Sequence, residues 1–223
     1  MQQTHPALIE TMRLADGQIA LWPGHRSRLL ASAQALGYRL DPAQIEQQVA
    51  LETHRLNDLP RQAAWRVRLL LQENGLCTLN SSPLPDTPVP VQLAWASDAL
   101  AGHTSPVLLD GDDTWRRHKS THRPWFAAAQ DWLQQHSDHF DLVFCDLADM
   151  PCEGSRCNLY VRDAQGTWLT PPASMGLLPG VQRQSLLAQK LVQEAPLSRH
   201  DLQTAPALRV SNALRGWLDA RLS

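Results

Sequence analysis

The stretch His118-Lys119-Ser120-Thr121-His122-Arg123 decides how the rest of this 223-residue chain is interpreted. Burial and neighbouring cations, here Arg117 or Arg123, lower the pKa of a lysine amine and so turn the amine into a nucleophile. Most lysines are simply solvated surface groups, so Lys119 is a candidate catalytic residue only because of the groups that accompany it.

Two later segments supply groups that complement an amine. Glu153 stands in Glu153-Gly154-Ser155-Arg156-Cys157-Asn158-Leu159, and the turn from Gly176 to Gly180 leads into a helix expected to begin at Val181. A helix N-terminus presents unpaired N–H groups that bind phosphate. Pyridoxal phosphate needs a lysine for the Schiff base, a carboxylate for its pyridine nitrogen and a cradle for its phosphate. The combination favours amine chemistry, although a surface glutamate and an ordinary Gly-x-x-Pro-Gly loop are the simpler interpretations of each part alone.

Composition argues against several other classes of protein. Apolar residues make up 43%, charged residues 19%, and the net charge is −2, which is typical of a soluble globular protein and unfavourable for nucleic acid or anionic membranes. No apolar run approaches the ~18 residues of a membrane-spanning helix. Neither the cysteines nor the histidines have metal-site spacing, so we expect no metal. We expect a cytoplasmic protein that binds neither nucleic acid nor membranes.

Strands and helices are predicted in mixed order in the first part of the chain. Hydrophobic periodicity and turn residues predict strands at 7–14, 18–21, 65–72, 76–79 and 91–95, and helices at about 23–37 and 41–55. Asp16-Gly17 and Asn74-Gly75 are predicted hairpin turns, and the proline-rich segment 81–90 is a predicted connector.

The second part of the chain shows the same mixture. Helices are predicted at 124–135 and 181–193, and strands at 142–145, 158–162, 167–169 and 208–211. This order predicts an α+β protein with two lobes. The expected division is a small N-terminal α/β lobe at 1–98, a linker at 99–107 and a larger cofactor-binding lobe at 108–223.

The order of these segments resembles the class IV aminotransferases, the pyridoxal-phosphate enzymes of fold type IV. Each motif is weak by itself, but the order and spacing together are specific. The resemblance implies that the larger C-terminal lobe carries a mixed, barrel-like sheet. The motifs that carry it are Glu10-x-x-Arg13, Asp16-Gly17, His25-x-x-Arg28-Leu29, His118-Lys119-Ser120-Thr121, Glu153-Gly154-Ser155-Arg156, Thr170-Pro171-Pro172, Gly176 to Val181, and Ser211 to Gly216.

The resemblance also implies roles for individual residues. Lys119 would be the catalytic Schiff-base lysine, Glu153 the partner of the pyridine nitrogen, and Arg28 a phosphate-binding arginine. Ala213 stands where a serine or threonine hydroxyl is common in the family, so a backbone group or the neighbouring Ser211 would serve instead. The other implied cofactor contacts are Asn158, Val181, Gln182 and Asn212, and the candidates for binding substrate carboxylates are Arg13, Arg156 and Arg215.

Within the family, the lysine segment and the ending Asn212-Ala213-Leu214-Arg215-Gly216 most resemble 4-amino-4-deoxychorismate lyase. This similarity implies an enzyme of folate biosynthesis that eliminates pyruvate and leaves 4-aminobenzoate. The alternative is a class IV aminotransferase acting on branched-chain or D-amino acids. A third interpretation is a catalytically inactive cofactor-binding or interaction protein, motivated by Ala213 and by the strand pair that usually precedes the Glu-x-x-Arg segment but is not seen ahead of Glu10. The family implies a homodimer with a small-molecule amine substrate.

Overall fold

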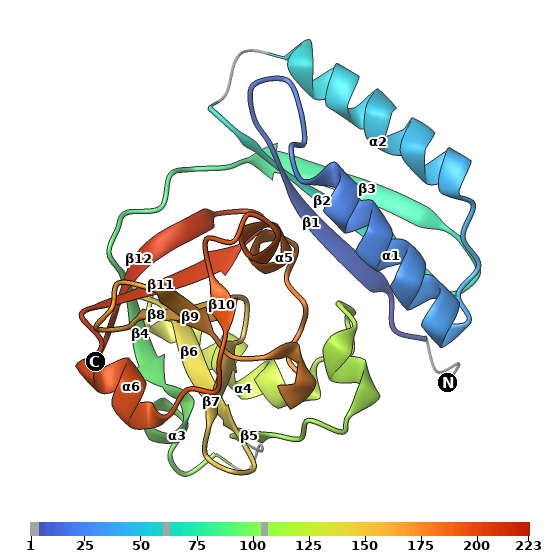
Figure 1. The fold of residues 1–223 in the computed structure, drawn as a ribbon. Helices are drawn as coiled ribbons and strands as arrows, with labels where there is room; N and C mark the ends of the chain where they lie inside the picture. The colour runs from blue at the N-terminus through green and yellow to red at the C-terminus, as the bar shows by residue number, and fades with distance from the viewer. Residues whose placement is uncertain (1–4, 60–62, 104–106) are drawn as a thin grey trace. The chain divides into compact units, whose positions relative to one another are not determined.

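The chain passes back and forth between two structural units (Figure 1). The computed structural model describes residues 5–59, 63–103 and 107–223. Unit 1 contains the described residues up to Asp86 together with His118–His122, and unit 2 contains Thr87–Arg117 and Arg123–Ser223. The division therefore falls at Asp86, in contrast to the expected boundary after residue 98. The expected linker 99–107 is assigned to unit 2, and its residues 104–106 lie outside the described residues.

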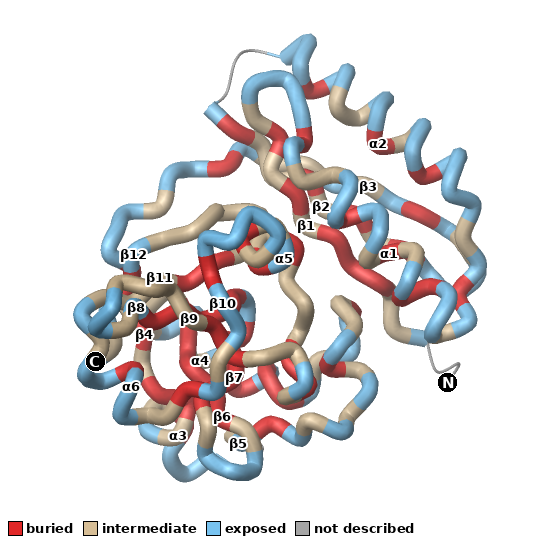
Figure 2. Tube along the Cα trace, viewed as in Figure 1, coloured by how far each residue is buried: buried red, intermediate tan, exposed pale blue. Residues whose placement is uncertain are grey.

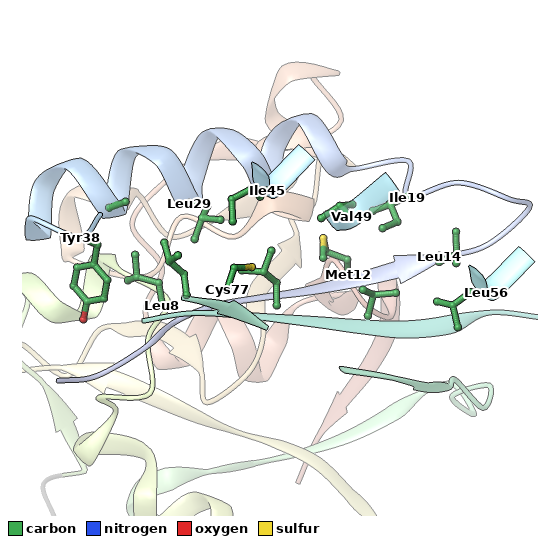
Figure 3. Packing of buried hydrophobic residues seen from close by; sticks show 14 residues of the cluster. Leu8, Met12, Leu14, Ile19, Leu29, Tyr38, Ile45, Val49, Leu56 and Cys77 are labelled. Carbon is green, nitrogen blue, oxygen red and sulfur yellow. The ribbon is translucent and has the colours of Figure 1, made fainter. Parts of the chain in front are cut away.

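Unit 1 is built on antiparallel strands whose apolar residues alternate. Among the described residues, β1 (Leu8–Leu14), β2 (Trp65–Leu71) and β3 (Cys77–Pro83) form one sheet in the order β1-β2-β3. Helices α1 (Trp22–Leu36) and α2 (Pro42–Asn57) cover one face of it. Because strand side chains alternate between the two faces, the apolar set of β1 and β2 points at these helices. Figure 3 shows the resulting core, which includes Leu8, Met12, Leu14, Ile19, Leu29, Tyr38, Ile45, Val49, Leu56 and Cys77.

The ends of the two helices confirm most of the predicted local signals. Gly37 ends α1 in the left-handed conformation at φ 72°, which glycine adopts without a steric penalty. Asp41 caps α2 by accepting the N–H of Ala43 at 2.9 Å. The predicted strand 18–21 is wrong: Gln18 forms only a single bridge with Ala15 across the Asp16-Gly17 turn. The chain enters α1 at once, since Pro23 sets the helix start.

Unit 2 is built around one curled sheet of mixed strand direction (Figure 1). Within its described residues, nine strands run in the order β10-β9-β8-β11-β12-β4-β6-β5, with β7 paired to β6. β4 is parallel to β6 and β12, whereas β11 is antiparallel to β8 and β12. The barrel-like mixed sheet expected for the larger lobe is therefore confirmed. The strands are β4 (Val91–Trp95), β5 (Leu108–Leu109), β6 (His139–Asp146), β7 (Pro151–Gly154), β8 (Asn158–Arg162), β9 (Trp168–Thr170), β10 (Gln193–Glu194), β11 (Ala207–Asn212) and β12 (Gly216–Leu222).

The central strands of this sheet are buried on both faces (Figure 2). Four successive residues of β8, from Asn158 to Val161, are buried, as are the five residues of β6 from Asp141 to Cys145. A strand buried on both faces reads as a continuous apolar run, so the polar residues inside such strands stand out. Asp141 and Asn158 are therefore candidates for organising roles.

Helices pack against the sheet of unit 2. They are α3 (Ala96–Ala99), α4 (Ala127–Gln135), α5 (Val181–Ala188) and α6 (Arg199–Thr204), with 3₁₀ turns at Thr114–Arg117, Pro124–Phe126 and Ala173–Met175. α5 begins where predicted but ends at Ala188, five residues before the predicted end at 193, and Lys190 turns the chain at φ 57°. β3 continues through Pro83 into the segment predicted as a connector.

None of the helices in the described part of the chain is long and apolar enough to cross a membrane. No group of His, Cys, Asp or Glu side chains among the described residues has the arrangement of a metal site.

Candidate functional site

Lys119 is held by its backbone on unit 1. Its carbonyl accepts the N–H of Ile9 at 2.8 Å, and the N–H of Thr121 donates to the carbonyl of Ala7 at 2.8 Å. Ser120 forms a bridge with Leu8 between these bonds. Residues 119–121 thus form one β-bridge with flanking hydrogen bonds beside the start of β1, which fixes the backbone from which the half-buried lysine side chain extends.

The histidine that precedes the lysine is also anchored. His118 Nδ1 and Ser32 Oγ are 2.9 Å apart, and Ser32, on α1, is buried. This bond ties the lysine segment to a helix as well as to a strand. The sequence placed His118 in the motif but gave Ser32 no role, because nothing in a single helix sequence shows which residue packs against it.

Arg28 lies in a buried cluster of unit 1. It forms a bidentate pair with Glu10, with Nε 2.9 Å from Oε1 and Nη2 2.5 Å from Oε2. His25 Nδ1 is 2.6 Å from the same Oε2. Burial by itself raises the pKa of the Glu10 carboxyl, but the charge of Arg28 and the hydrogen bonds from His25 and Arg28 lower this pKa to about 2. Glu10 therefore stays ionised and orients the arginine that was predicted to bind phosphate.

Glu153 is buried in β7 of unit 2, where both of its oxygens are engaged. Oε1 accepts Nη2 of Arg116 at 3.1 Å, and Oε2 accepts the backbone N–H of Leu178 at 3.1 Å. Burial raises the pKa of Glu153, and the guanidinium of Arg116 and the N–H of Leu178 offset part of this rise. The prediction of an isolated glutamate near a strand start missed both its burial and its cation.

Asn158 and the start of α5 share the same turn. Asn158 Nδ2 donates to the carbonyl of Leu178 at 3.1 Å. Gly180 is the N-cap of α5 and gives the helix no side-chain cap. A Cβ built on Gly180 would collide with Asn158 Oδ1. The Asn158 side chain thus packs directly against Gly180, and the first N–H groups of α5, on Val181 and Gln182, receive no hydrogen bond from an N-cap side chain.

Asp141 organises the turn that connects Glu153 to Asn158. Its Oδ1 accepts the N–H and the hydroxyl of Ser155 at 3.0 and 2.6 Å, and its Oδ2 accepts the N–H of Arg156 at 2.9 Å and the thiol of Cys157 at 3.0 Å. The carboxylate is fully buried. One side chain thus fixes every residue of the turn but its glycine, and it does so from the neighbouring strand β6.

The end of β11 lies beside Asn158. Ser211 is paired in register with Asn158, and its hydroxyl is 2.7 Å from the hydroxyl of Tyr160 on β8. Asn212 Nδ2 donates to the carbonyl of Arg156 at 3.3 Å. The half-buried Ala213 follows in the turn to β12. Unit 2 therefore gathers Glu153, Asn158, Val181, Gln182, Ser211, Asn212 and Ala213 around one set of strand ends and one helix start.

The three arginines considered for substrate binding lie in different settings. Arg13 is half-buried on β1, in register with Arg66 of β2, and belongs to unit 1. Arg156 is exposed in the turn that Asp141 fixes. Arg215 is half-buried, and its N–H donates to Asn212 Oδ1 at 2.8 Å. The Asn212 side chain thus hydrogen-bonds to the backbone of both Arg156 and Arg215. Arg13 belongs to unit 1, as do Lys119 and Arg28.

The chain is similar to known proteins of one family. The family model described as amino-transferase class IV matches residues 7–222. The chain is 25% identical over 213 residues to a candidate aminodeoxychorismate lyase of Schizosaccharomyces pombe, covering 93% of this chain and 86% of that protein. It is similar to the structure of a candidate amino-acid aminotransferase of Mesorhizobium loti, with a TM-score of 0.83, 30% identity, and coverage of 98% of this chain and 100% of that one.

A structure with bound cofactor has the same fold. The pyridoxal-phosphate form of a hypothetical aminotransferase of Mycobacterium tuberculosis has a TM-score of 0.77 at 19% identity, covering 97% of this chain and 81% of that one. At this identity the likeness concerns the fold alone.

Proposed function

Because the chain belongs to the class IV aminotransferases, whose members use pyridoxal phosphate, we propose that it is a lyase acting on 4-amino-4-deoxychorismate. The products are pyruvate and 4-aminobenzoate, which makes the reaction a step of folate biosynthesis. The name of the Schizosaccharomyces pombe relative supports this substrate. The structural observation that carries the proposal is the turn at Leu178, which binds the buried Glu153 on one side and leads to the uncapped start of α5 on the other.

The residues of unit 2 fit pyridoxal phosphate on two observations. Helix α5 begins at Gly180 without a side-chain cap, so no capping side chain occupies the N–H groups of Val181 and Gln182, and these groups suit a phosphate. Glu153 is a buried carboxylate whose two oxygens each accept one hydrogen bond, and a carboxylate has about four acceptor positions. It therefore has capacity for a protonated ring nitrogen.

Each candidate residue has its own role toward the group. When bound, pyridoxal phosphate supplies an aldehyde that combines with amines and a ring that withdraws electrons. Lys119 would bind the aldehyde carbon and Glu153 would hold the proton at the ring nitrogen. Phosphate contacts would come from Arg28 and from the N–H groups at the α5 start. Asn158 would line the ring, and Ser211, Asn212 and Ala213 would complete the phosphate side.

Lys119 carries the proton transfers in this proposal. Nζ of Lys119 would remove the proton from the substrate carbon that bears the amine. The electron pair left there expels the enolpyruvyl oxygen, and protonation of the released enol gives pyruvate. The ring becomes aromatic, which makes the step strongly favourable. Arg13, Arg156 and Arg215 are the candidates to bind the carboxylates of the substrate.

An aminotransferase is the second candidate, because the Mesorhizobium loti structure with 30% identity bears that description. The first proton transfer is then the same. In this alternative the cofactor would take up the amino group, water would supply the oxygen of the keto acid, and Nζ of Lys119 would move the proton without any leaving group being expelled. Branched-chain or D-amino acids are the substrates in this alternative.

One assay separates the two activities. We expect the purified protein with pyridoxal phosphate to release pyruvate and 4-aminobenzoate from 4-amino-4-deoxychorismate. Formation of keto acid from amino donors without any 4-aminobenzoate would instead establish the aminotransferase. Activity in neither assay, with the cofactor bound, would leave only the inactive binding protein.

The chain offers a matched control for the lysine, since Lys119 and Lys190 are its two lysines. Borohydride reduction followed by mass spectrometry of the peptides should place the cofactor on Lys119. K119A should abolish both the label and the visible absorbance band, whereas K190A should retain both. A label on Lys190 would refute the assignment.

The proposal also includes a homodimer located in the cytoplasm, which the family resemblance supports. Sedimentation of the purified protein should give twice the mass of the 24.9 kDa chain. A monomer that is fully active would remove this part of the proposal.

A further inference from the structure

Arg116 is the cation that contacts Glu153. It lies in the 3₁₀ turn Thr114–Arg117, its side chain is 1% exposed, and Nη2 is 3.1 Å from Glu153 Oε1. The adjacent Arg117 is exposed and donates to the carbonyl of Gly111 at 3.4 Å. Of these two neighbouring arginines, the first faces the carboxylate and the second faces solvent.

Stability alone is a poor explanation for this buried arginine. Besides Glu153, Nη2 contacts Cys152 Sγ at 3.4 Å, while Nε and Nη1 have no hydrogen-bond partner among the described residues. A buried ion pair often contributes no more than a pair of apolar residues of the same volume, because desolvation offsets the attraction. Each orphaned donor adds a further cost. The cost points to a role in the chemistry of the site.

Glu153 needs a nearby positive charge if it is to be ionised when the cofactor arrives. Burial raises the pKa of its carboxyl, and the first opposing influence is the charge of Arg116. The guanidinium binds Oε1 and the Leu178 N–H binds Oε2, so the carboxylate is held from two directions. A neutral carboxyl group would donate to a ring nitrogen and leave that nitrogen uncharged, which would remove most of the electron-withdrawing power of the ring.

We propose that Arg116 is a positioning residue that keeps the Glu153 carboxylate ionised and oriented, so that Glu153 can hold a proton on the ring nitrogen of pyridoxal phosphate. The proposal rests on the assignment of Glu153 in the proposed function. Arg116 acts only through Glu153 and has no contact of its own with the cofactor.

A double-mutant cycle on cofactor affinity tests this dependence. The proteins are wild type, R116M, E153Q and R116M/E153Q, each freed of cofactor, titrated with pyridoxal phosphate and followed by the visible absorbance band. R116M should weaken binding roughly tenfold or more, as expected for a lost charged hydrogen bond. R116M/E153Q should bind as E153Q does, within about twofold, because Arg116 has nothing to act on once the carboxylate is gone. R116K keeps the charge and should restore most of the affinity.

A spectroscopic readout separates positioning from a merely structural role. With nitrogen-15 in the cofactor ring, the chemical shift of the ring nitrogen reports whether it is protonated. The wild type and R116K should show the protonated nitrogen, and R116M the unprotonated one. A purely structural arginine would lower the unfolding temperature without moving this signal.

The double-mutant cycle remains informative even if R116M does not fold. E153Q and R116M/E153Q contain no uncompensated carboxylate, so their comparison stands alone if R116M does not fold. A further loss of affinity on adding R116M to E153Q, or wild-type affinity and an unchanged ring shift in R116M, would overturn the proposal. Failure of the proposed function looks different: wild type would bind no pyridoxal phosphate, or E153Q would match wild type in both affinity and ring shift.

Discussion

The side-chain oxygen of Asn158 lies where a side chain on residue 180 would begin, so Gly180 and Asn158 fit together only while residue 180 is glycine. The backbone of Gly180 has φ −61°, which any residue adopts, so the close approach and not the backbone requires the glycine. The relationship joins a strand of the sheet to the helix start at which we propose that phosphate binds.

Replacing Gly180 by alanine should therefore damage the candidate site. We expect G180A to displace Asn158 or the first turn of α5, to destabilise the protein by about 1–3 kcal/mol as overpacking does, and to weaken binding of pyridoxal phosphate. Chemical unfolding and cofactor titration measure the two effects. G166A is the control: Gly166 lies in the exposed turn between β8 and β9, so it should cost stability through its φ of 88° without affecting the cofactor. Unchanged affinity in G180A would contradict the placement of the phosphate.

The pH dependence of stability should carry the signature of Glu10. Its pKa falls from 4.5 to about 2 on folding, against the effect of burial and because of Arg28 and His25. A carboxyl with a depressed pKa stabilises the folded state above its unfolded pKa, and this contribution is lost as pH falls from 4.5 towards 2. A shift of this size corresponds to about 3 kcal/mol.

E10Q should lack this loss of stability at acid pH. Its free energy of unfolding should change less than that of the wild type between pH 5 and pH 2, about the window set by the two pKa values. Urea unfolding at a series of pH values measures it. E46Q alters a half-exposed glutamate of α2 and should leave the shape of the curve unchanged. If the free energy of unfolding of E10Q fell as steeply at acid pH as that of the wild type, Glu10 would not be the group responsible for the fall.

Replacing one carboxylate oxygen of Asp141 by an amide nitrogen should destabilise the turn that Asp141 binds. All of the groups that it binds in the turn, on Ser155, Arg156 and Cys157, are donors. An asparagine amide would present a donor to some of them in either orientation, so D141N should cost about 2–4 kcal/mol of stability and weaken cofactor binding. D131N, which changes an exposed residue of α4, should lie within about 0.5 kcal/mol of the wild type. Equal stability of the two variants would exclude the organising role.

Tyr160 should affect the affinity for the cofactor through its hydrogen bond to Ser211. A hydroxyl has one donor and two acceptor positions, so a serine that accepts from Tyr160 can still donate to a phosphate. We expect Y160F and S211A each to lose about 1 kcal/mol and to weaken binding of pyridoxal phosphate, S211A more strongly. Y38F breaks the hydrogen bond from Tyr38 to the carbonyl of Pro6 in unit 1 and should cost stability without changing the affinity. Identical affinities in S211A and wild type would assign the phosphate contact to backbone groups alone.

Local signals in the sequence predicted local structure well. Asp41 before Pro42 predicted the start of α2, and Gly37 predicted the end of α1, because capping depends on neighbouring residues alone. The strand predicted at 158–162, before the Gln165-Gly166 turn, is confirmed. The predicted strand at 18–21 failed because a turn signal says where a chain reverses and not whether a second strand follows.

The residues that surround the candidate site were harder to predict. Arg116 and Arg117 are equivalent in the sequence, and only the fold buries the first. Asp141 lies in a strand whose apolar residues were recognised from Leu142 onward, so the polar residue before them was left out. Strand β12 was not predicted, and its pairing with β4 spans most of unit 2. Long-range pairing is the information that a single sequence lacks.

The bridge between residues 119–121 and the start of β1 has a consequence for how this protein folds while it is being synthesised. The first 86 residues emerge with β1 as an edge strand, and the segment that pairs with the start of that edge follows more than 30 residues later. During that interval the nascent sheet exposes backbone groups that can pair with another chain. A fragment that stops at Asp86 should accordingly aggregate, and synthesis past His122 is needed before the amine of Lys119 has a scaffold.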